Sequence, residues 1–427
     1  MRYLIGVITV IFFSIAAYAD TLISNSTVIT MGNAGVLENT NVYIRRDRII
    51  RVGAEPPQDF QLTKEIDGSG KYLIPGLAEM HGHLPSASAA STQTEETLFL
   101  YLAGGVTTVR GMLGDPVQFE MRKAIKAGTL TGPTLYLAAP SLNGNTVSSV
   151  ADGIAKTRRY HNEGWDLLKI HPGLSLGEYN AIARTANQLG LPFGGHVPAD
   201  VGIERALEAG QTSIDHLDGF LRLTDDYNHA ITSADIAKIV AVYKAHKPSW
   251  IVPTQALFNI LIAGGDPDTL AARPENIYMP VNTRASWDRR LRRIDRNQNV
   301  HASQNRQKAL RALAVAGARI VMGSDAPQLY SVPGFSLKRE VEVMLEAGFT
   351  ADEILKISTR NAGDYFADKD TFGQIAKGMR ADLLLLDADP RVDALNLFQQ
   401  SGVMAAGRWY SRQMIESQLA KIAARNN

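Results

Sequence analysis

The chain contains no cysteine among its 427 residues. This absence excludes a disulfide framework, a thiolate metal site and a thiol nucleophile. It suits an oxidising exterior such as a bacterial periplasm. The chain also lacks an excess of charge of either sign, because 44 Lys and Arg residues balance 43 Asp and Glu residues. The composition therefore predicts no nucleic-acid partner, leaves a small molecule as the expected substrate, and says nothing of the oligomeric state.

Long apolar runs are scarce, and the one that stands out lies at the start of the chain. Leu4 to Ala17 spans about fourteen residues after the basic Arg2, which is short for a membrane helix of about twenty residues. Ala17-Tyr18-Ala19 then fits the small-residue cleavage pattern of a secretory signal. We expect residues 1–19 to be a signal peptide, whose removal leaves a periplasmic protein that begins at Asp20 and has no stable membrane span. An uncleaved anchor is the alternative.

Short strands are expected near both ends of the mature chain. Asn41–Ile44 and Arg48–Val52 flank a charged turn, which is typical of an antiparallel β unit. Further along, Gly378–Asp387 and Val403–Tyr410 return to strand-like patterns before a terminal helix. We expect the two end segments to form one small β-sandwich domain, residues 20–74 and 372–427.

Between these segments, apolar strand-like runs alternate with helical stretches. Eight such runs predict an α/β fold, a (β/α)₈ TIM barrel over residues 75–371. One helix is expected over Ala181–Leu189, and another after the capping box Thr350-Ala-Asp-Glu353. The eight runs are Leu73–His83, Gly105–Arg110, Thr134–Pro140, Asp166–His171, Leu191–His196, Thr212–His216, Ser249–Pro253 and Ala318–Ser324.

Residues 264–305 interrupt this alternation. The segment is rich in Arg, Asp and Pro, and Trp287–Asn299 is expected to form a charged helix. A long insertion after a barrel strand lies at the catalytic mouth, where it could act as a lid. A solvated surface excursion is the alternative.

Two histidines end the first run. His81 and His83 are two positions apart, so on a strand their imidazoles point to the same face and can reach one metal ion. Gly82 between them needs no room for a side chain on the opposite face. The pair is a candidate half of a metal site.

Lys169 lies inside an apolar strand, where its ammonium would have to lose its hydration. One interpretation is a lysine whose head reaches the rim of the barrel. The functional interpretation is a neutral amine that has captured CO₂ as a carbamate, which would provide a carboxylate able to bridge two metal ions. His171, two residues on, shares the face of Lys169 and is a candidate substrate contact or a packing residue.

Three more polar side chains follow other runs, and the whole set gathers at the carboxyl ends of strands one, four, five, six and eight. In a barrel this is the end where catalytic residues lie. Imidazole and carboxylate ligands suit Zn²⁺ and related ions, and a bridging carboxylate can hold two of them about 3.5–4 Å apart. The additional residues are His196, His216 and Asp325.

The chain resembles the amidohydrolase superfamily, and within it the imidazolonepropionase-like and prolidase-like secreted hydrolases. The resemblance rests on Pro-Gly-Leu-Ala-Glu-Met-His-Gly-His, Gly-Val-Thr-Thr-Val-Arg, Leu-Leu-Lys-Ile, Gly-Gly-His-Val, Ile-Asp-His, Gly-Ser-Asp-Ala and Gly-Gln-Ile-Ala-Lys-Gly-Met-Arg-Ala-Asp-Leu, in that order. It implies His81, His83 and Asp325 on one metal ion, His196 and His216 on the other, and a carboxylated Lys169 between them. After the third strand, where prolidase-like members usually carry Gly-Gly-His, this chain departs and has Ser141-Leu-Asn-Gly-Asn.

The resemblance implies hydrolysis by a metal-bound hydroxide, with two divalent ions, expected to be Zn²⁺, lowering the pKa of the attacking water. Asp325 is the expected catalytic residue, taking the proton and passing it to the leaving group. The leading hypothesis is cleavage of an amide C–N bond in a small peptide-like or cyclic-amide substrate. A lactonase, esterase or phosphotriesterase-like enzyme is the alternative, and a periplasmic binding protein that lost catalysis is a third. Candidate substrate contacts are Arg110, Asn143, His171 and Tyr330.

Overall fold

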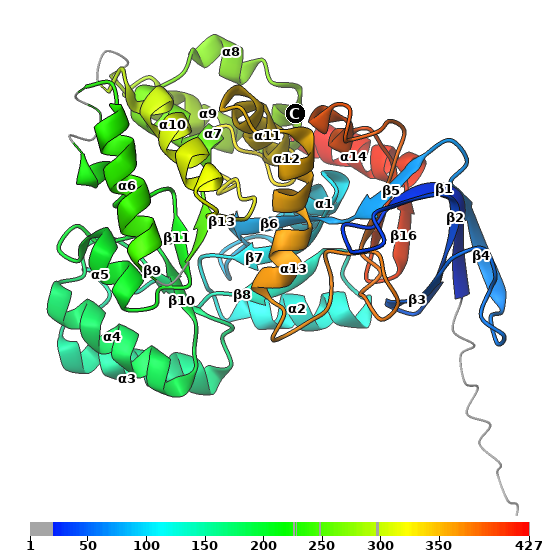
Figure 1. The fold of residues 1–427 in the computed structure, drawn as a ribbon, viewed down its shortest axis with the longest axis horizontal. Coiled ribbons are helices and arrows are strands. Elements are labelled where there is room, and N and C mark those ends of the chain that lie inside the picture. Colours follow the sequence, from blue (N-terminus) through cyan, green and yellow to red (C-terminus); the bar gives the residue numbers. More distant parts are fainter. Residues whose placement is uncertain (1–19, 225–226, 228, 247–248, 296–298, 427) are drawn as a thin grey trace, which may run out of the picture.

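The computed structural model describes residues 20–224, 227, 229–246, 249–295 and 299–426 (Figure 1). The predicted signal peptide, residues 1–19, lies outside this range. Among the described residues, no helix has both the length and the apolar character to cross a membrane.

The two ends of the chain meet in one mixed sheet of eight strands, ordered β16-β15-β14-β5-β1-β2-β3 with β4 paired to β1. Strand β5 lies parallel to β1 and antiparallel to β14, so the first and last strands in Figure 1 share a sheet. The pairing does not divide this sheet into two layers, and the sandwich stays a prediction. The strands are β1 (Asp20–Ile29), β2 (Val36–Arg45), β3 (Arg48–Val52), β4 (Leu62–Asp67), β5 (Tyr72–Pro75), β14 (Leu383–Leu386), β15 (Gln400–Ala405) and β16 (Arg408–Ser411).

Eight short parallel strands follow, one at each predicted apolar run, as two sheets ordered β6-β7-β8 and β13-β12-β11-β10-β9. Seven lie within their runs, and β7 ends one residue beyond its run, at Gly111. Parallel bridges join Ala138 to Leu167 and Leu142 to Ile170, between β8 and β9. At the other edge, Met80 N donates to Met322 O at 2.8 Å, which ties the first strand to the segment after the last. The strands are β6 (Leu77–Gly82), β7 (Val106–Gly111), β8 (Thr134–Leu137), β9 (Leu168–Ile170), β10 (Phe193–Gly195), β11 (Ser213–Asp215), β12 (Trp250–Val252) and β13 (Arg319–Ile320).

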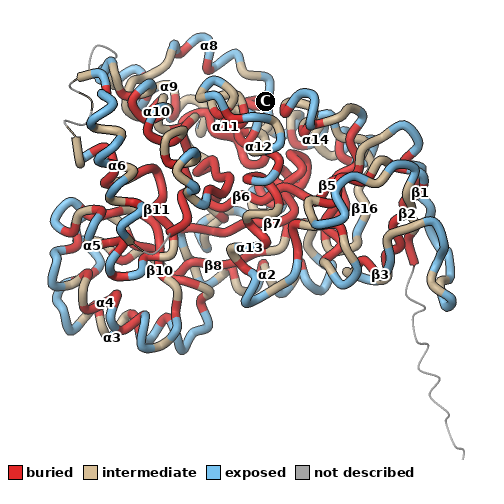
Figure 2. Tube along the Cα trace, viewed as in Figure 1, coloured by how far each residue is buried: buried red, intermediate tan, exposed pale blue. Residues whose placement is uncertain are grey.

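The parallel strands are buried on both faces. Every residue of β6 and β7 is buried, including polar ones such as Glu79, Thr108 and Arg110, so these strands do not alternate between buried and exposed positions. Figure 2 shows this buried interior, with exposed residues on the outer faces of the surrounding helices. The first predicted run is split in two, because β5 joins the small sheet and β6 the parallel one. Gly76 lies at the crossing, where a Cβ atom would come 2.2 Å from Thr107 Oγ1.

Helices connect the strands, and their ends follow capping signals. The capping box of Thr350 and Glu353 is present and starts α12, as predicted. The helix predicted from Ala181 begins earlier, at Leu176, because Ser175 and Glu178 form a second capping box. The main helices around the parallel strands are α1 (Ser91–Ala103), α2 (Val117–Ala127), α3 (Val150–Glu163), α4 (Leu176–Leu189), α5 (Gly202–Glu208), α6 (Ser233–Ala245), α7 (Gln255–Ala263), α10 (Ala302–Val315), α11 (Ser336–Glu346), α12 (Ala351–Ser358) and α13 (Arg360–Tyr365), and α14 (Arg412–Asn426) ends the chain.

The predicted insertion contains α8 (Pro267–Ala271), the 3₁₀ turn Pro274–Tyr278 and α9 (Val281–Leu291). The expected helix over Trp287–Asn299 was wrong in its bounds. The helix starts directly after Pro280 and ends where Leu291 completes its buried face, and residues 296–298 lie outside the described part. The Trp287 ring lies 5.5 Å from the ring of Tyr330, in the loop after β13. The insertion therefore contacts the end of the strands that carries Asp325.

Candidate metal centre

Among the described residues, three side chains at or just after the ends of the first and last parallel strands form a cluster of metal-binding donors. One ligand atom each of His81, His83 and Asp325 lies within 4.8 Å of the others. Asp325 Oδ1 is 2.5 Å from His83 Nε2 and 3.7 Å from His81 Nε2. The cluster is held by the backbone, because Asp325 N donates to His81 O at 2.8 Å. Two strand ends distant in sequence thus bring three metal-binding groups to one point.

Lys169 on β9 is fully buried and points into the same cluster. Its Nζ lies 3.0 Å from His81 Nε2. Burial lowers the pKa of Lys169 to about 8, against the opposing pull of Asp215 and Asp325. Gly195 on the neighbouring strand has φ +121°, and a Cβ atom there would come 3.1 Å from Lys169 Cδ. The sequence supplies glycine where the lysine side chain needs room.

His216 and His196 complete the set. The His216 ring centre is 4.4 Å from that of His81 and 4.4 Å from that of His196, so the three imidazoles form a continuous group. Burial lowers the pKa of His216 and of His81 well below the usual range, which keeps both imidazoles neutral. His196 is oriented by Asp218, whose Oδ2 lies 2.6 Å from His196 Nδ1.

The donor chemistry fits divalent metal ions. His216 Nε2 is buried and has no hydrogen-bond partner among the described residues, while its Nδ1 lies 2.7 Å from Thr254 Oγ1. A buried neutral nitrogen with a free lone pair is costly unless it binds something. His216 and Asp325 also have positive φ angles of 65° and 61°, the kind of backbone strain that gathers at functional sites. All six predicted ligands therefore converge, in a donor set suited to Zn²⁺ and similar ions.

Arg110 does not face this centre as a free cation. It is fully buried, and its Nη2 donates to both oxygens of Asp215 at 3.2 and 3.1 Å. Its other nitrogens donate to Met80 O, Ser213 Oγ and Tyr365 Oη. The guanidinium is thus occupied by protein groups, and the hypothesis of a substrate contact at Arg110 gains no support from this geometry.

Asp215 links Arg110 to the metal-binding group. Its Oδ2 is 2.7 Å from His81 Nδ1, although the ring N–H direction does not meet hydrogen-bond geometry. Burial opposes ionisation of Asp215, but Arg110 and Lys169 outweigh it and lower the pKa of the carboxyl. Asp215 is therefore a buried anion behind His81 that sequence reasoning did not single out.

Glu79 is the second residue that sequence reasoning missed. It is fully buried on β6, where its Oε1 accepts from the backbone N–H groups of His81 and Ser324 at 3.0 and 2.8 Å. Ser324 Oγ donates to its Oε2 at 2.5 Å. Burial raises the pKa of Glu79 to about 8. Glu79 joins the strand that carries two predicted ligands to the loop that carries the third.

The other candidate substrate contacts lie in two places. His171 is beside the centre, with its ring 4.9 Å from the His196 ring, and burial lowers its pKa to about 2. Asn143 contacts His171 only through Ser141. Tyr330 is 2% exposed and packs against Trp287, which makes it part of the core beneath the insertion.

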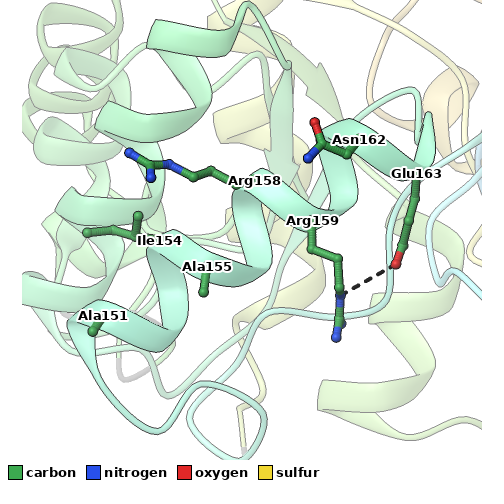
Figure 3. Close-up of a pocket in the computed structure, with 7 residues that line it drawn as sticks. All are labelled: Ala151, Ile154, Ala155, Arg158, Arg159, Asn162 and Glu163. Atoms are coloured by element: carbon green, nitrogen blue, oxygen red, sulfur yellow. Dashed lines mark ion pairs between the residues drawn. The ribbon is translucent and has the colours of Figure 1, made fainter.

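A shallow recess of 660 Å³ lies elsewhere, along the outer face of α3 (Figure 3). Its lining comes from that single helix, and Arg159 and Glu163 pair across it at 3.5 Å. None of the predicted ligands lines it. The chemistry of this chain is therefore argued from the donor cluster and not from this surface recess.

Curated proteins of known name match parts of this chain. The chain is 30% identical to the 5-methylthioadenosine/S-adenosylhomocysteine deaminase of Thermoanaerobacter pseudethanolicus over 123 residues, 27% of this chain and 28% of that protein. It is 25% identical to the adenine deaminase of Clostridium perfringens over 207 residues, 40% of this chain and 34% of that protein. The chain thus matches about a third or less of the length of these curated relatives.

Solved structures match over a greater length. Bottromycin amidohydrolase gives a TM-score of 0.76 at 21% identity, covering 95% of this chain and 90% of that one. A Xaa-Pro dipeptidase gives 0.69 at 20% identity, covering 92% and 100%. These likenesses support a TIM-barrel-like α/β fold. The model of the amidohydrolase family matches residues 72–410 and so spans all six predicted ligands. The chain belongs to the amidohydrolase family.

Proposed function

We propose that this protein is a binuclear metal-dependent hydrolase that cleaves an amide C–N bond in a small peptide-like or cyclic-amide substrate. The observation that carries the proposal is the convergence of four histidines, one buried lysine and one aspartate from five separate strand ends. Lys169 is buried with its Nζ 3.0 Å from an imidazole nitrogen, and no carboxylate of the described residues forms a hydrogen bond with that Nζ. A purely structural role would not require a lysine in this place, because burying its charge is costly.

His81, His83 and Asp325 would hold one metal ion, and His196 and His216 the other. Divalent ions bound there would polarise the substrate carbonyl and lower the pKa of the attacking water. Zn²⁺ is the proposed ion because imidazole and carboxylate donors suit it. Thr254 and Asp218 support the second pair by fixing the Nδ1 side of His216 and His196.

Lys169 would bridge the two ions as a carbamate. The ammonium would first give up one proton. The neutral Nζ would then attack CO₂, a C–N bond would form as one C–O π bond opens, and a second proton would leave for solvent, so that a cation is replaced by an anion with two oxygens. The lowered pKa of about 8 supports this step, because a neutral amine is needed as the nucleophile. An ammonium in the same place would repel the ions that the surrounding histidines hold.

Asp325 is the proposed proton carrier. Its Oδ1 is 2.5 Å from His83 Nε2, and its side chain is only 7% exposed, so it faces the centre and not bulk solvent. One carboxylate oxygen would accept the proton of the attacking water and then deliver it to the leaving nitrogen. The backbone bond to His81 and the Glu79–Ser324 contact fix its position for this transfer.

Support for a C–N bond as the target comes from the relatives. Two are named as deaminases, and structural neighbours include an amidohydrolase, a dipeptidase and ochratoxinase of A. niger.

To test the proposal, metal content is measured on the purified protein, and a panel of dipeptides, N-acyl amino acids, cyclic amides, lactones and an organophosphate triester is screened. We expect close to two equivalents of metal and turnover of an amide. If only lactones or the triester are turned over, the amide proposal is replaced by the esterase alternative. If the protein binds no metal and stays inactive after incubation with Zn²⁺, the proposal is refuted.

Lys169 variants test the bridge. We expect Lys169→Ala to lose the second metal ion and most of its rate, and acetate or propionate to restore part of both by filling the gap. Lys169→Arg is the control that should not respond, because its guanidinium stays charged and fills the space. Full metal content and a near-native rate in Lys169→Ala would refute the bridge.

The proposal also covers the domain organisation and the export of the chain. We infer that the two parallel sheets form one (β/α)₈ barrel over residues 75–371, and that residues 20–74 and 372–427 form the small domain beside it. The backbone bonds between β6 and the segment after β13 support closure. The apolar N-terminal run and Ala17-Tyr18-Ala19 support export to the periplasm.

A further inference from the structure

A short chain of polar contacts runs from Asn143 to the metal centre. Asn143 Nδ2 donates to Ser141 Oγ at 2.8 Å, and Ser141 Oγ lies 2.5 Å from His171 Nδ1. Ser141 and Asn143 lie in the loop after β8, in the segment Ser141-Leu-Asn-Gly-Asn that departs from the prolidase-like pattern, and His171 directly follows β9. The two loops are fixed to each other, because Leu142 N donates to Lys169 O and His171 N to Leu142 O, both at 2.9 Å.

The direction of the first contact is set by the loop itself. Asn143 Oδ1 accepts from the backbone N–H groups of Asn145 and Thr146 at 2.8 and 3.0 Å. A carbonyl oxygen can accept both bonds, whereas an amide nitrogen could accept neither. The side-chain amide therefore cannot be turned over, and it presents its nitrogen, a donor, to Ser141 Oγ.

The direction of the second contact follows from the first. Ser141 Oγ accepts from Asn143, and its own hydroxyl proton needs an acceptor. His171 Nδ1 at 2.5 Å is the acceptor the structure provides. A neutral imidazole that accepts at Nδ1 carries its proton at Nε2. The loop thus selects the tautomer in which His171 Nε2 is a donor.

The His171 ring lies beside the centre, and its Nε2 is unused among the described residues. The ring lies 4.9 Å from that of His196, a proposed ligand of the second metal ion. In the described part of the chain Nε2 makes no hydrogen bond, and the side chain is half-buried, so a small molecule bound at the centre can reach it.

We propose that His171 Nε2–H donates to the oxygen of the scissile carbonyl as that oxygen gains negative charge, with Ser141 and Asn143 as positioning residues that hold the tautomer. The inference rests on the proposed hydrolase function and adds a substrate contact to it. A fixed neutral donor in a buried site strengthens its bond as charge develops, which is how oxyanion donors accelerate hydrolysis. The substrate class is thereby an acyl compound with a carbonyl oxygen directed at His171.

The opposite tautomer would mean a different role. If His171 were a further metal ligand through Nε2, that nitrogen would need a free lone pair, and Nδ1–H would donate to Ser141. Ser141 Oγ would then accept two bonds and leave its own proton without a protein partner. The arrangement of Asn143 therefore favours the donor role over the ligand role.

Kinetics on the best amide substrate of the panel test the contact. We expect His171→Leu to lower kcat by about 10²–10³-fold with little change in KM, the scale of one lost oxyanion donor. His171→Gln, which can place an amide N–H near the position of Nε2, should recover most of that loss. A phosphonate analogue of the substrate, which carries the developing charge, should lose about as much affinity as the rate falls. A rise in KM with unchanged kcat in His171→Leu would overturn the proposal.

The positioning residues are tested by reversing the relay. Asn143→Asp keeps the acceptor for both loop N–H groups but turns an acceptor towards Ser141, so the hydroxyl donates to it and Nδ1 gains the proton. We expect Asn143→Asp to lower kcat nearly as far as His171→Leu, whereas Ser141→Thr, which keeps the hydroxyl, should stay near native. Ser141→Ala should cost only about three- to tenfold, the range for one lost hydrogen bond.

A readout that needs no turnover completes the test. In protein with ¹⁵N-labelled histidine, NMR distinguishes the protonated ring nitrogen from the unprotonated one, with His171→Gln used to assign the signal. We expect Nε2–H in the wild type, Nδ1–H in Asn143→Asp, and native metal content in both and in His171→Leu. Nδ1–H in the wild type, or loss of metal from His171→Leu, would make His171 a ligand and overturn the proposal. If no substrate is turned over, the proposed function fails, and the NMR result still decides whether the relay exists.

Discussion

Replacing Arg110 by methionine tests whether this residue supports the fold or contacts substrate. Methionine keeps most of the apolar volume and removes the guanidinium. The guanidinium donates to five oxygen atoms, including both oxygens of Asp215, and it is fully buried. The substitution would remove the cation that is hydrogen-bonded to the buried carboxylate of Asp215.

The size of the effect follows from that burial. Removing one partner of a buried, hydrogen-bonded ion pair costs about 3–5 kcal/mol, because the remaining charge is uncompensated. A surface pair would cost at most about 1 kcal/mol. We therefore expect Arg110→Met to lower the free energy of unfolding by about 3–5 kcal/mol, and Arg110→Lys to lose less, because it keeps the charge but not the planar fork.

Urea denaturation of the metal-free protein, followed by tryptophan fluorescence, measures the change without contributions from bound metal. The double variant Arg110→Met/Asp215→Asn removes both charges and should recover part of the loss, with a coupling energy of about 0.5–3 kcal/mol. An unchanged unfolding midpoint in Arg110→Met, together with a raised KM, would refute the structural role and restore Arg110 as a substrate contact.

Three further changes have expected outcomes. Asp325→Asn should keep much of the metal yet lower kcat by about 10²–10⁴-fold; a loss below tenfold with metal retained would show that another group carries the proton. Gly195→Ala adds a Cβ atom 2.5 Å from Ile170 O and 3.1 Å from Lys169 Cδ, so it should reduce metal content in elemental analysis. Gly190→Ala, at φ +65° with open space around it, is the matched control that should keep the metal. Mass spectrometry of exported protein should find Asp20 as the first residue, and retained Met1 would contradict the signal peptide.

The predicted ligands converge because their positions depend on topology alone. Parallel strands end at one edge of their sheet, so residues at the strand ends meet whatever the details of packing. The same-face spacing that paired His81 with His83 extends back to Glu79, so the sequence held a signal for that buried carboxylate too. Capping boxes were as reliable, since Thr350 starts its helix as predicted.

The substrate contacts were harder to predict because they depend on which way a side chain turns. Residues of β7 are buried on both faces, so alternation along the strand could not tell whether Arg110 faces the centre or the interior behind it. The Asn143–Ser141–His171 relay crosses two loops, and its direction follows from hydrogen bonds of a turn that has no periodic pattern. The bounds of α9 were missed because the run of charged residues after Trp287 looks helical beyond the point where its buried face ends.

The mixed sheet combines strands from both ends of the chain, so part of it can pair only after the last strands have been synthesised. Strand β5 is complete early, but its partner β14 comes near the end of the chain, and Arg48 contacts Asp370, which lies 322 positions later. Contacts this far apart in sequence form late and slowly, because a long loop must close first. A chain still being synthesised therefore carries one edge of β5 unpaired after the last predicted ligand, Asp325, has already emerged, whereas the partners of β1 all precede residue 76. An open strand edge can pair with strands of other molecules, and the arrival of β14 (Leu383–Leu386) covers this one.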